Sequence, residues 1–143
     1  MKSYEIIGHT ADIGLKVNGE TLKKLFENAA KGMFEIIAGE GAHEPITAPV
    51  DQKIQIKKEF ESFEELLVEW LSELLYIFNK EEILFNSFKI QDLSYDGITG
   101  KVSGKKINPA NRALQTEIKA VTFHGLKIEE DKTGFNCKII FDV

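Results

Sequence analysis

Residues 63–78 carry a helical pattern that is apolar almost all the way round, and this pattern restricts what the chain can fold into. Only a thin polar strip interrupts it, made of Glu64, Glu65, Glu69, Ser72 and Glu73. A helix with so little polar surface is buried on nearly every side. The chain has 143 residues, the usual size of one domain. We therefore expect layers of structure on both sides of this helix.

An amphipathic helix is predicted nearer the start of the chain. Thr21 is suited to cap its N-terminus, and Gly39 and Gly41 mark its end. Its apolar side chains recur at helical spacing; they are Leu22, Leu25, Phe26, Ala29, Ala30, Met33, Phe34 and Ile37. This stripe indicates a helix that packs one face on a neighbouring layer.

Most of the remaining chain has the alternating or apolar character of strands. The predicted strands are 3–8, 13–17, 50–60, 88–93, 98–107, 114–123, 126–129 and 135–142. Helices early and strands late indicate the α+β class with largely antiparallel pairing. No repeat, linker or low-complexity tract divides the chain, so we expect a single domain over residues 1–143.

The overall charge is acidic, with a formal net charge of −5 and a pI of about 5.3. This charge argues against a broad electrostatic grip on nucleic acid, but it leaves a local basic patch open. The single cysteine, Cys137, cannot form an internal disulfide, which fits a reducing compartment. No export leader is evident, and no apolar run reaches the ~18 residues of a membrane span. We expect a cytoplasmic protein without a membrane segment.

Motifs of the familiar catalytic centres are absent from the sequence: there is no nucleophile elbow, CxxC, HExxH or Walker A motif. Residues 100–106, GKVSGKK, lack the glycine spacing of a phosphate-binding loop, and we interpret them as an ordinary basic hairpin. Lys105, Lys106 and Arg112 flank Asn108-Pro109 in what is expected to be a solvated basic loop. Cys137 fits a core position better than a nucleophile.

The link between the first two strands contains two ionisable residues, His9 and Asp12. A carboxylate that is buried without a partner costs several kcal/mol, so Asp12 needs one. The commoner interpretation is a turn aspartate bonded to local amides. The alternative is a ligand for a hard cation, which prefers carboxylate oxygens. His9, taken alone, is more often a hydrogen-bonded structural histidine than a ligand.

A second carboxylate stands at the end of the last predicted strand. Alternation puts Asp142 on the face opposite the apolar residues of that strand, beside Val143 and its terminal carboxylate. Oxygen anions held close together repel one another unless a cation lies among them. A frayed, solvated chain end is the alternative.

Lys119 is a lone cation within a strand-like stretch, IKAVTFH at 118–124. One interpretation is an edge lysine whose stem lies along apolar surface while its ammonium reaches water. The functional interpretation is a cation that lies close to the carboxylates or meets an anion of a partner. The sequence leaves both open.

Several motifs, taken together, resemble the archease family. They are HTADIG at 9–14, the pattern GxTLxxLFxxAA at 19–30, WLSELLY at 70–76, IKAVTFH at 118–124 and IIFDV at 139–143. The motifs follow one another in the family's order and span the whole chain. The sequence departs from the family pattern at Phe123, where tyrosine is common, and at Ala113 after Arg112, where histidine is common. The second departure leaves the role of that loop open.

This resemblance implies a fold, a partner and a site. The fold is a β/α/β sandwich with two main helices between mostly antiparallel sheets. The function is that of a non-enzymatic accessory protein of the GTP-dependent, RtcB-type tRNA-splicing ligase, whose guanylylation and repeated turnover it promotes; an indirect contact with tRNA is compatible with this role, and direct contact with RNA is left open. A divalent cation, calcium or alternatively magnesium or manganese, is bound by Asp12 and Asp142 with Val143 as a neighbouring oxygen donor. Lys119 is functionally important, and His9 is expected to orient Asp12 or to contact the ligase.

Two other classes of function remain as alternatives. A metal-dependent hydrolase would use Asp12 and Asp142 around an activated water, although few further acid–base groups cluster in the sequence. A chaperone-like or RNA-binding module is the other alternative, and the acidic charge argues against its direct affinity for RNA.

Overall fold

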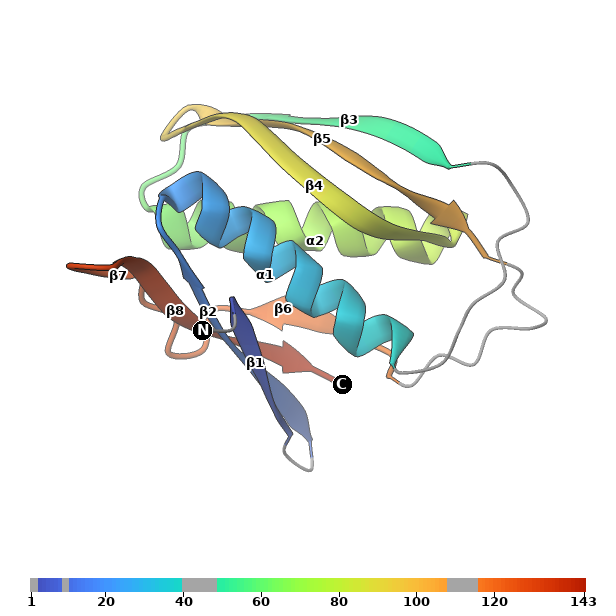
Figure 1. Cartoon of the computed structure of the whole chain (residues 1–143), viewed down its shortest axis with the longest axis horizontal. Coiled ribbons are helices and arrows are strands. Elements are labelled where there is room, and N and C mark those ends of the chain that lie inside the picture. The colour runs from blue at the N-terminus through green and yellow to red at the C-terminus, as the bar shows by residue number, and fades with distance from the viewer. Residues whose placement is uncertain (1–2, 9–10, 40–48, 108–115) are drawn as a thin grey trace.

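Two helices lie between a five-stranded and a three-stranded sheet in the computed structural model, which describes residues 3–8, 11–39, 49–107 and 116–143 (Figure 1). The helices are α1 (Leu22–Ala38) and α2 (Phe63–Glu81). Every strand pair within these ranges is antiparallel. The predicted α+β class and the layered arrangement of helices between sheets are confirmed.

The five-stranded sheet combines the two ends of the chain. Its order is β1-β2-β8-β6, with β7 also paired to β8. The strands are β1 (Tyr4–Gly8), β2 (Asp12–Gly19), β6 (Ala120–Thr122), β7 (Glu129–Asp131) and β8 (Gly134–Asp142). β8 is an interior strand, and this brings the last residues of the chain beside the first hairpin.

The three-stranded sheet covers the other side of the helices and comes from the middle of the chain. Its order is β3-β5-β4, with β5 (Gly97–Lys106) between β3 (Val50–Lys57) and β4 (Ile83–Ser94). Apolar side chains such as Ile54 face the helices, while the alternate positions face solvent. This sheet therefore has one buried face and one wet face.

Several predicted strand bounds were wrong. β4 is much longer than the expected 88–93, because it starts directly after α2 through Glu82, which adopts a left-handed conformation with φ 57°. The strand predicted at 50–60 ends at Lys57. Only 120–122 of the segment predicted at 114–123 pair as a strand, with 114–115 outside the described residues. The short strand expected at 126–129 instead covers Glu129–Asp131.

Helix α2 is buried as its sequence predicts. Trp70, Leu71 and Leu74 are fully buried and Leu75 is nearly so, and α2 contacts β4 and β5 on one side and β6 on the other. Tyr76, which belongs to the same apolar pattern, is instead 58% exposed. Among the described residues no helix combines the length and apolar character needed to cross a membrane.

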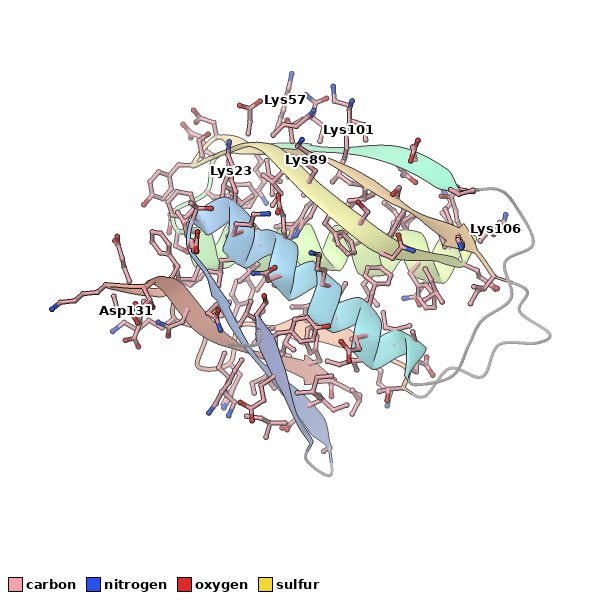
Figure 2. All side chains as sticks on the ribbon, in the orientation of Figure 1. Lys23, Lys57, Lys89, Lys101, Lys106 and Asp131 are labelled. Atoms are coloured by element: carbon pink, nitrogen blue, oxygen red, sulfur yellow. The ribbon has the colours of Figure 1, made fainter. Side chains whose placement is uncertain are left out.

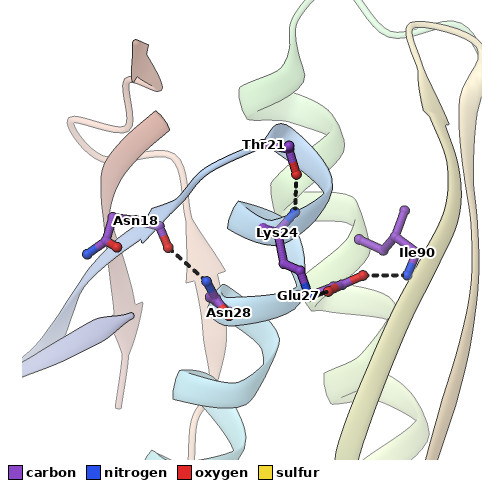
Figure 3. A network of polar contacts seen from close by, with 6 residues as sticks. All are labelled: Asn18, Thr21, Lys24, Glu27, Asn28 and Ile90. Carbon is purple, nitrogen blue, oxygen red and sulfur yellow. Dashed lines mark hydrogen bonds and ion pairs between the residues drawn. The ribbon is translucent and has the colours of Figure 1, made fainter. Parts of the chain in front are cut away.

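Helix α1 is hydrogen-bonded to both sheets by the side chains of two consecutive residues, Glu27 and Asn28 (Figure 3). The Glu27 carboxylate, almost entirely buried, accepts a hydrogen bond from the Ile90 N–H of β4 at 2.8 Å. The Asn28 amide donates to the Asn18 carbonyl of β2 at 2.8 Å. A buried backbone group needs a partner, and here side chains of α1 bond to backbone groups of one strand in each sheet.

The Glu27 bond lies at an irregularity of β4. The pairing of β4 with β5 shifts by one residue between Ile90 and Asp92, as it does at a β-bulge. Lys23 donates to the Gln91 carbonyl in this interval at 2.8 Å, and Lys24 pairs with Glu27 at 3.2 Å. Side chains in the first turns of α1 therefore bond to the Ile90 N–H and the Gln91 carbonyl, the two backbone groups at the register shift.

We expect Leu74→Ala to lower the free energy of unfolding by about 2–5 kcal/mol, because a fully buried leucine leaves a cavity when truncated. Urea denaturation of both proteins measures this difference. The matched control is Glu73→Ala, since Glu73 is exposed on the same helix and should change stability by no more than ~0.5 kcal/mol. A loss below ~1 kcal/mol for Leu74→Ala would contradict burial between two layers.

We expect Glu27→Ala to cost about 1–3 kcal/mol, because it leaves the buried Ile90 N–H without an acceptor. Glu27→Gln keeps an oxygen that can accept this bond and should cost clearly less. Urea denaturation gives both values, and amide exchange at Ile90 reports the bond directly. Equal losses for the two variants would show that the charge of Glu27, and not its bond to β4, holds the helix.

Candidate functional site

Asp12 and Asp142 stand directly opposite each other at one end of the five-stranded sheet. The register of β2 and β8 pairs Asp12 with Asp142. Residues directly opposite on neighbouring strands project to the same face, with β-carbons about 4.5–5.5 Å apart. Asp12 is half-buried and Asp142 is exposed. The fold thus brings together two carboxylates that are 130 positions apart, as 142 less 12, in the sequence.

The buried face of the sheet fixes this register. Ile13 pairs with Phe141, and further along Leu15 pairs with Ile139, and Leu15, Ile139 and Phe141 are fully buried. A shift by one residue would turn every side chain of a strand to the other face. Burial of these apolar pairs therefore places Asp12 opposite Asp142 on the wet face.

No described residue neutralises the pair. Within the described part of the chain neither carboxylate takes part in a hydrogen bond or an ion pair. Like charges directly across a ladder repel. The described residues contain no group of three or more His, Cys, Asp or Glu side chains that could hold a metal ion. Side-chain ligands at this end of the sheet are therefore limited, in the described ranges, to the two aspartates.

Lys119 lies next to the pair through its backbone. Its N–H donates to the Asp142 carbonyl at 2.7 Å, and the following residue, Ala120, pairs with Asp142 in the β6–β8 ladder. The Lys119 side chain is exposed at the edge of the sheet. Asp12 and Asp142 therefore lie on adjacent strands, and Lys119, which directly precedes β6, is brought to the same end of the sheet by its backbone.

Val143 follows Asp142 and is half-buried, with its side chain packed against the core. This packing and the pairing of Asp142 with both β2 and β6 show an ordered strand end, so the frayed end considered from sequence is wrong. His9 and Arg112 fall outside the described residues. The predicted part of His9 in the site stays a prediction.

Lys138 is a neighbour of the site that the sequence did not reveal. A β-carbon built on Gly14 would lie 3.0 Å from Lys138 Cε, so the Lys138 side chain lies across Gly14, two residues from Asp12. Only the register of β2 with β8 shows this, because Gly14 pairs with Ile140 on the same strand as Lys138. The wet face here carries a lysine stem close to the carboxylate pair.

Cys137 is buried, as its structural interpretation expects, whereas the basic segment 100–106, interpreted as a hairpin, is part of a single strand. Cys137 is buried, and this burial, with a smaller effect of Glu64, raises the pKa of its thiol to about 12. A thiol with such a pKa is a poor nucleophile at neutral pH. Residues 100–106 lie in β5 and not before a helix.

Residues 4–143 match the family model described as "Archease protein family (MTH1598/TM1083)". The chain belongs to the archease family. Proteins named archease from Methanosarcina acetivorans and Methanothermobacter thermautotrophicus are 37% and 36% identical to it, covering 99% and 100% of this chain and 97% and 100% of theirs. None of these names describes a catalytic activity.

Solved archease structures share the fold. The solution structure of protein 1598 from Methanobacterium thermoautotrophicum superposes with a TM-score of 0.78 at 34% identity, covering 100% of both chains. A Thermotoga maritima crystal structure described as an archease and "possible chaperone" superposes with a TM-score of 0.61 at 24% identity, covering 97% of this chain and 96% of its own. At that identity the second likeness supports the fold alone.

We expect Asp12→Asn to raise the free energy of unfolding by about 0.2–1 kcal/mol in a metal chelator at low ionic strength, because it removes repulsion from Asp142. The gain should shrink near 1 M salt, where screening acts over ~3 Å. Urea denaturation measures both conditions. Asp92→Asn, an exposed aspartate of the other sheet that faces Thr99, is the control and should show no gain. A loss of stability for Asp12→Asn would favour the turn-aspartate interpretation.

Proposed function

We propose that this archease is a non-catalytic activator of an RtcB-type RNA ligase in tRNA splicing, acting through the end of the five-stranded sheet that carries Asp12 and Asp142. The observation that carries the proposal is the direct pairing of these two aspartates without a neutralising group among the described residues. The activator promotes guanylylation of the ligase and its repeated turnover. This role implies a cytoplasmic location.

A divalent cation fits the donor set at this end of the sheet. Hard cations prefer carboxylate oxygens, and calcium takes six to eight oxygen ligands from side chains, carbonyls and water. Asp12 and Asp142 would hold it, with main-chain oxygens at Val143 as further donors. Magnesium and manganese are the alternatives to calcium, since both also accept carboxylates. When bound, the ion supplies positive charge where the ligase handles a triphosphate.

Lys119 gives the site a second cation. Its backbone bond to Asp142 holds it at the strand end while its side chain is exposed. An ammonium group in this position can meet a phosphate oxygen or a carboxylate of the ligase. Enzymes that transfer phosphoryl groups work mainly by stabilising the negative charge on the group being transferred. A lysine and a metal ion at this site would both stabilise that charge.

The alternatives have less support in the fold. A hydrolase needs a general acid or base beside its metal. Among the described residues, no third His, Cys, Asp or Glu side chain joins the two aspartates to serve as that group. A general chaperone needs a broad exposed apolar surface. The large exposed apolar side chains in the described part of the chain, Ile6, Tyr76, Tyr95 and Phe123, lie on four different segments.

The test is a guanylylation assay of a cognate ligase with GTP and saturating metal. We expect Asp12→Ala and Asp142→Ala each to reduce the stimulation at least ~10-fold, because even residues that only support a ligand typically affect activity by 10–100-fold. Lys119→Ala should also weaken it. All three side chains are at least partly solvent-exposed, so the fold should be retained, which circular dichroism checks.

The controls are Asp92→Ala and Lys132→Ala, which make the same charge changes at exposed positions elsewhere and should stimulate like the unmodified protein. Calorimetric titration with calcium gives an independent reading of the cation site, since Asp12→Ala should abolish the binding. Unchanged stimulation by all three site variants would exclude this end of the sheet from the mechanism. Turnover of GTP or RNA by the protein without the ligase would favour an enzyme instead.

A further inference from the structure

The outer face of the three-stranded sheet carries a row of three lysines. The register pairs Lys53 of β3 with Lys101 of β5, and Lys101 with Lys89 of β4. Figure 2 shows Lys89 and Lys101 on the side of this sheet away from the helices, with Lys57 close by. We call Lys53, Lys89 and Lys101 the lysine row. Strands lie about 4.8 Å apart, so the row spans about 10 Å.

No described residue forms an ion pair with the lysine row. In the described part of the chain the ion pairs are Lys24–Glu27 and Lys58–Glu69, neither of which involves the row. Like charges directly opposite in a ladder repel. Lysines on edge strands are explained by protection against edge-to-edge association, which accounts for Lys53 and Lys89. Lys101 is on the central strand, and edge protection does not explain it.

The surroundings of the row are polar and positive. The outward positions of β3, of β5 and of β4 from Ser87 onward hold no apolar side chain. Lys57 and Lys105 also stand at outward positions. The acidic residues at the outward positions of these three strands are Asp51 and Asp92. A depression of about 390 Å³ lies at the row; besides the three lysines it is lined by Asp51, Gln52, Ser87, Val102 and Ser103. This face is basic although the chain has a net charge of −5.

We propose that the lysine row is a docking surface for the phosphodiester backbone of RNA. Lysine binds phosphate as a point charge, and serine hydroxyls add donors to phosphate oxygens. Nucleic-acid interfaces are polar and strongly positive, whereas protein interfaces are depleted in lysine and have an apolar centre. The row matches the first description. The choice of RNA over DNA rests on the proposed function, because the ligase joins RNA.

The contact would be independent of base sequence. The outward positions named above carry no aromatic or arginine side chain on which a base could stack. Phosphate contacts position a nucleic acid without reading it. At a rise of about 3.4 Å per nucleotide in one strand of a duplex, a row of about 10 Å meets two or three phosphates.

The row and the aspartate pair lie on different sheets, with the helices between them (Figure 1). An RNA on the three-stranded sheet therefore leaves the Asp12–Asp142 end of the other sheet accessible. The carboxylates there would repel RNA phosphates, which orients an RNA toward the row. The protein can then hold RNA on one side and meet the ligase with the other.

The experiment measures binding of the purified full-length chain, without ligase, to a fluorescently labelled single-stranded RNA, a duplex RNA and a DNA of the same sequence. We expect RNA binding at ~50 mM salt that weakens steeply with added salt. The triple variant K53Q/K89Q/K101Q should bind at least ~10-fold more weakly. Its salt slope should fall by about two, since each lysine released from a phosphate removes about 0.7–0.9 from the slope.

The matched control is K16Q/K127Q/K138Q, which makes the same change of charge on the five-stranded sheet and its adjoining loop. We expect it to keep the RNA affinity within about twofold, whereas a general charge effect would weaken both variants alike. The melting temperature of the row variant should not fall, because the change removes repulsion. Absence of RNA binding by the unmodified chain, equal loss in both triple variants, or stronger binding to DNA than to RNA would overturn the proposal.

Guanylylation of the ligase separates this proposal from the proposed function. K53Q/K89Q/K101Q should still stimulate guanylylation in the absence of RNA, because the row is not on the Asp12–Asp142 end of the fold. If this variant keeps its RNA affinity but no longer binds the ligase, the row is a protein interface and the RNA proposal is wrong.

Discussion

Three consecutive residues of α1 hold the layers of this fold together. The Phe26 carbonyl accepts the buried Trp70 indole N–H of α2, the Glu27 carboxylate accepts the Ile90 N–H of β4, and the Asn28 amide donates to the Asn18 carbonyl of β2. Successive side chains of a helix point about 100° apart, so Glu27 and Asn28 can reach different sheets, while Phe26 bonds to α2 through its main-chain carbonyl. A helix with apolar contacts alone could rotate or slide between two sheets at modest cost. These directional bonds give α1 one position, and both sheets are placed relative to it.

This position leaves each sheet with one wet face, and the two faces differ in character. The five-stranded sheet presents a pair of carboxylates at one end, and the three-stranded sheet presents lysines across its middle. Both features consist of like charges set directly opposite each other. The net charge of −5 is a sum over the whole chain, so it does not reveal that each sheet carries a local cluster of charges of one sign.

The sequence was sufficient where the decisive contacts are local or periodic. The burial of Trp70 and Leu74 follows from a helical pattern, and the opposite faces of β8 follow from alternation. The lysine row could not be found this way, because Lys53, Lys89 and Lys101 meet only through strand pairing. The role of the glycines in residues 100–106 also depends on strand pairing and could not be inferred from the sequence. A β-carbon on Gly104 would lie 2.1 Å from the Leu84 carbonyl oxygen, so this glycine permits close approach of β4 and does not cradle a phosphate.

The aspartates are held opposite each other by stronger forces than the repulsion between them. A like-charged pair across a ladder costs about 0.2–1 kcal/mol. A slip of β8 by one residue would relieve it, but the slip would turn Ile139 and Phe141, both fully buried, toward water. Burial of one such side chain contributes about 1.5–3 kcal/mol, so the apolar face decides the register. Any group that neutralised the pair would relieve this repulsion. The fold thus fixes the position of both carboxylates from the opposite, apolar side of the sheet.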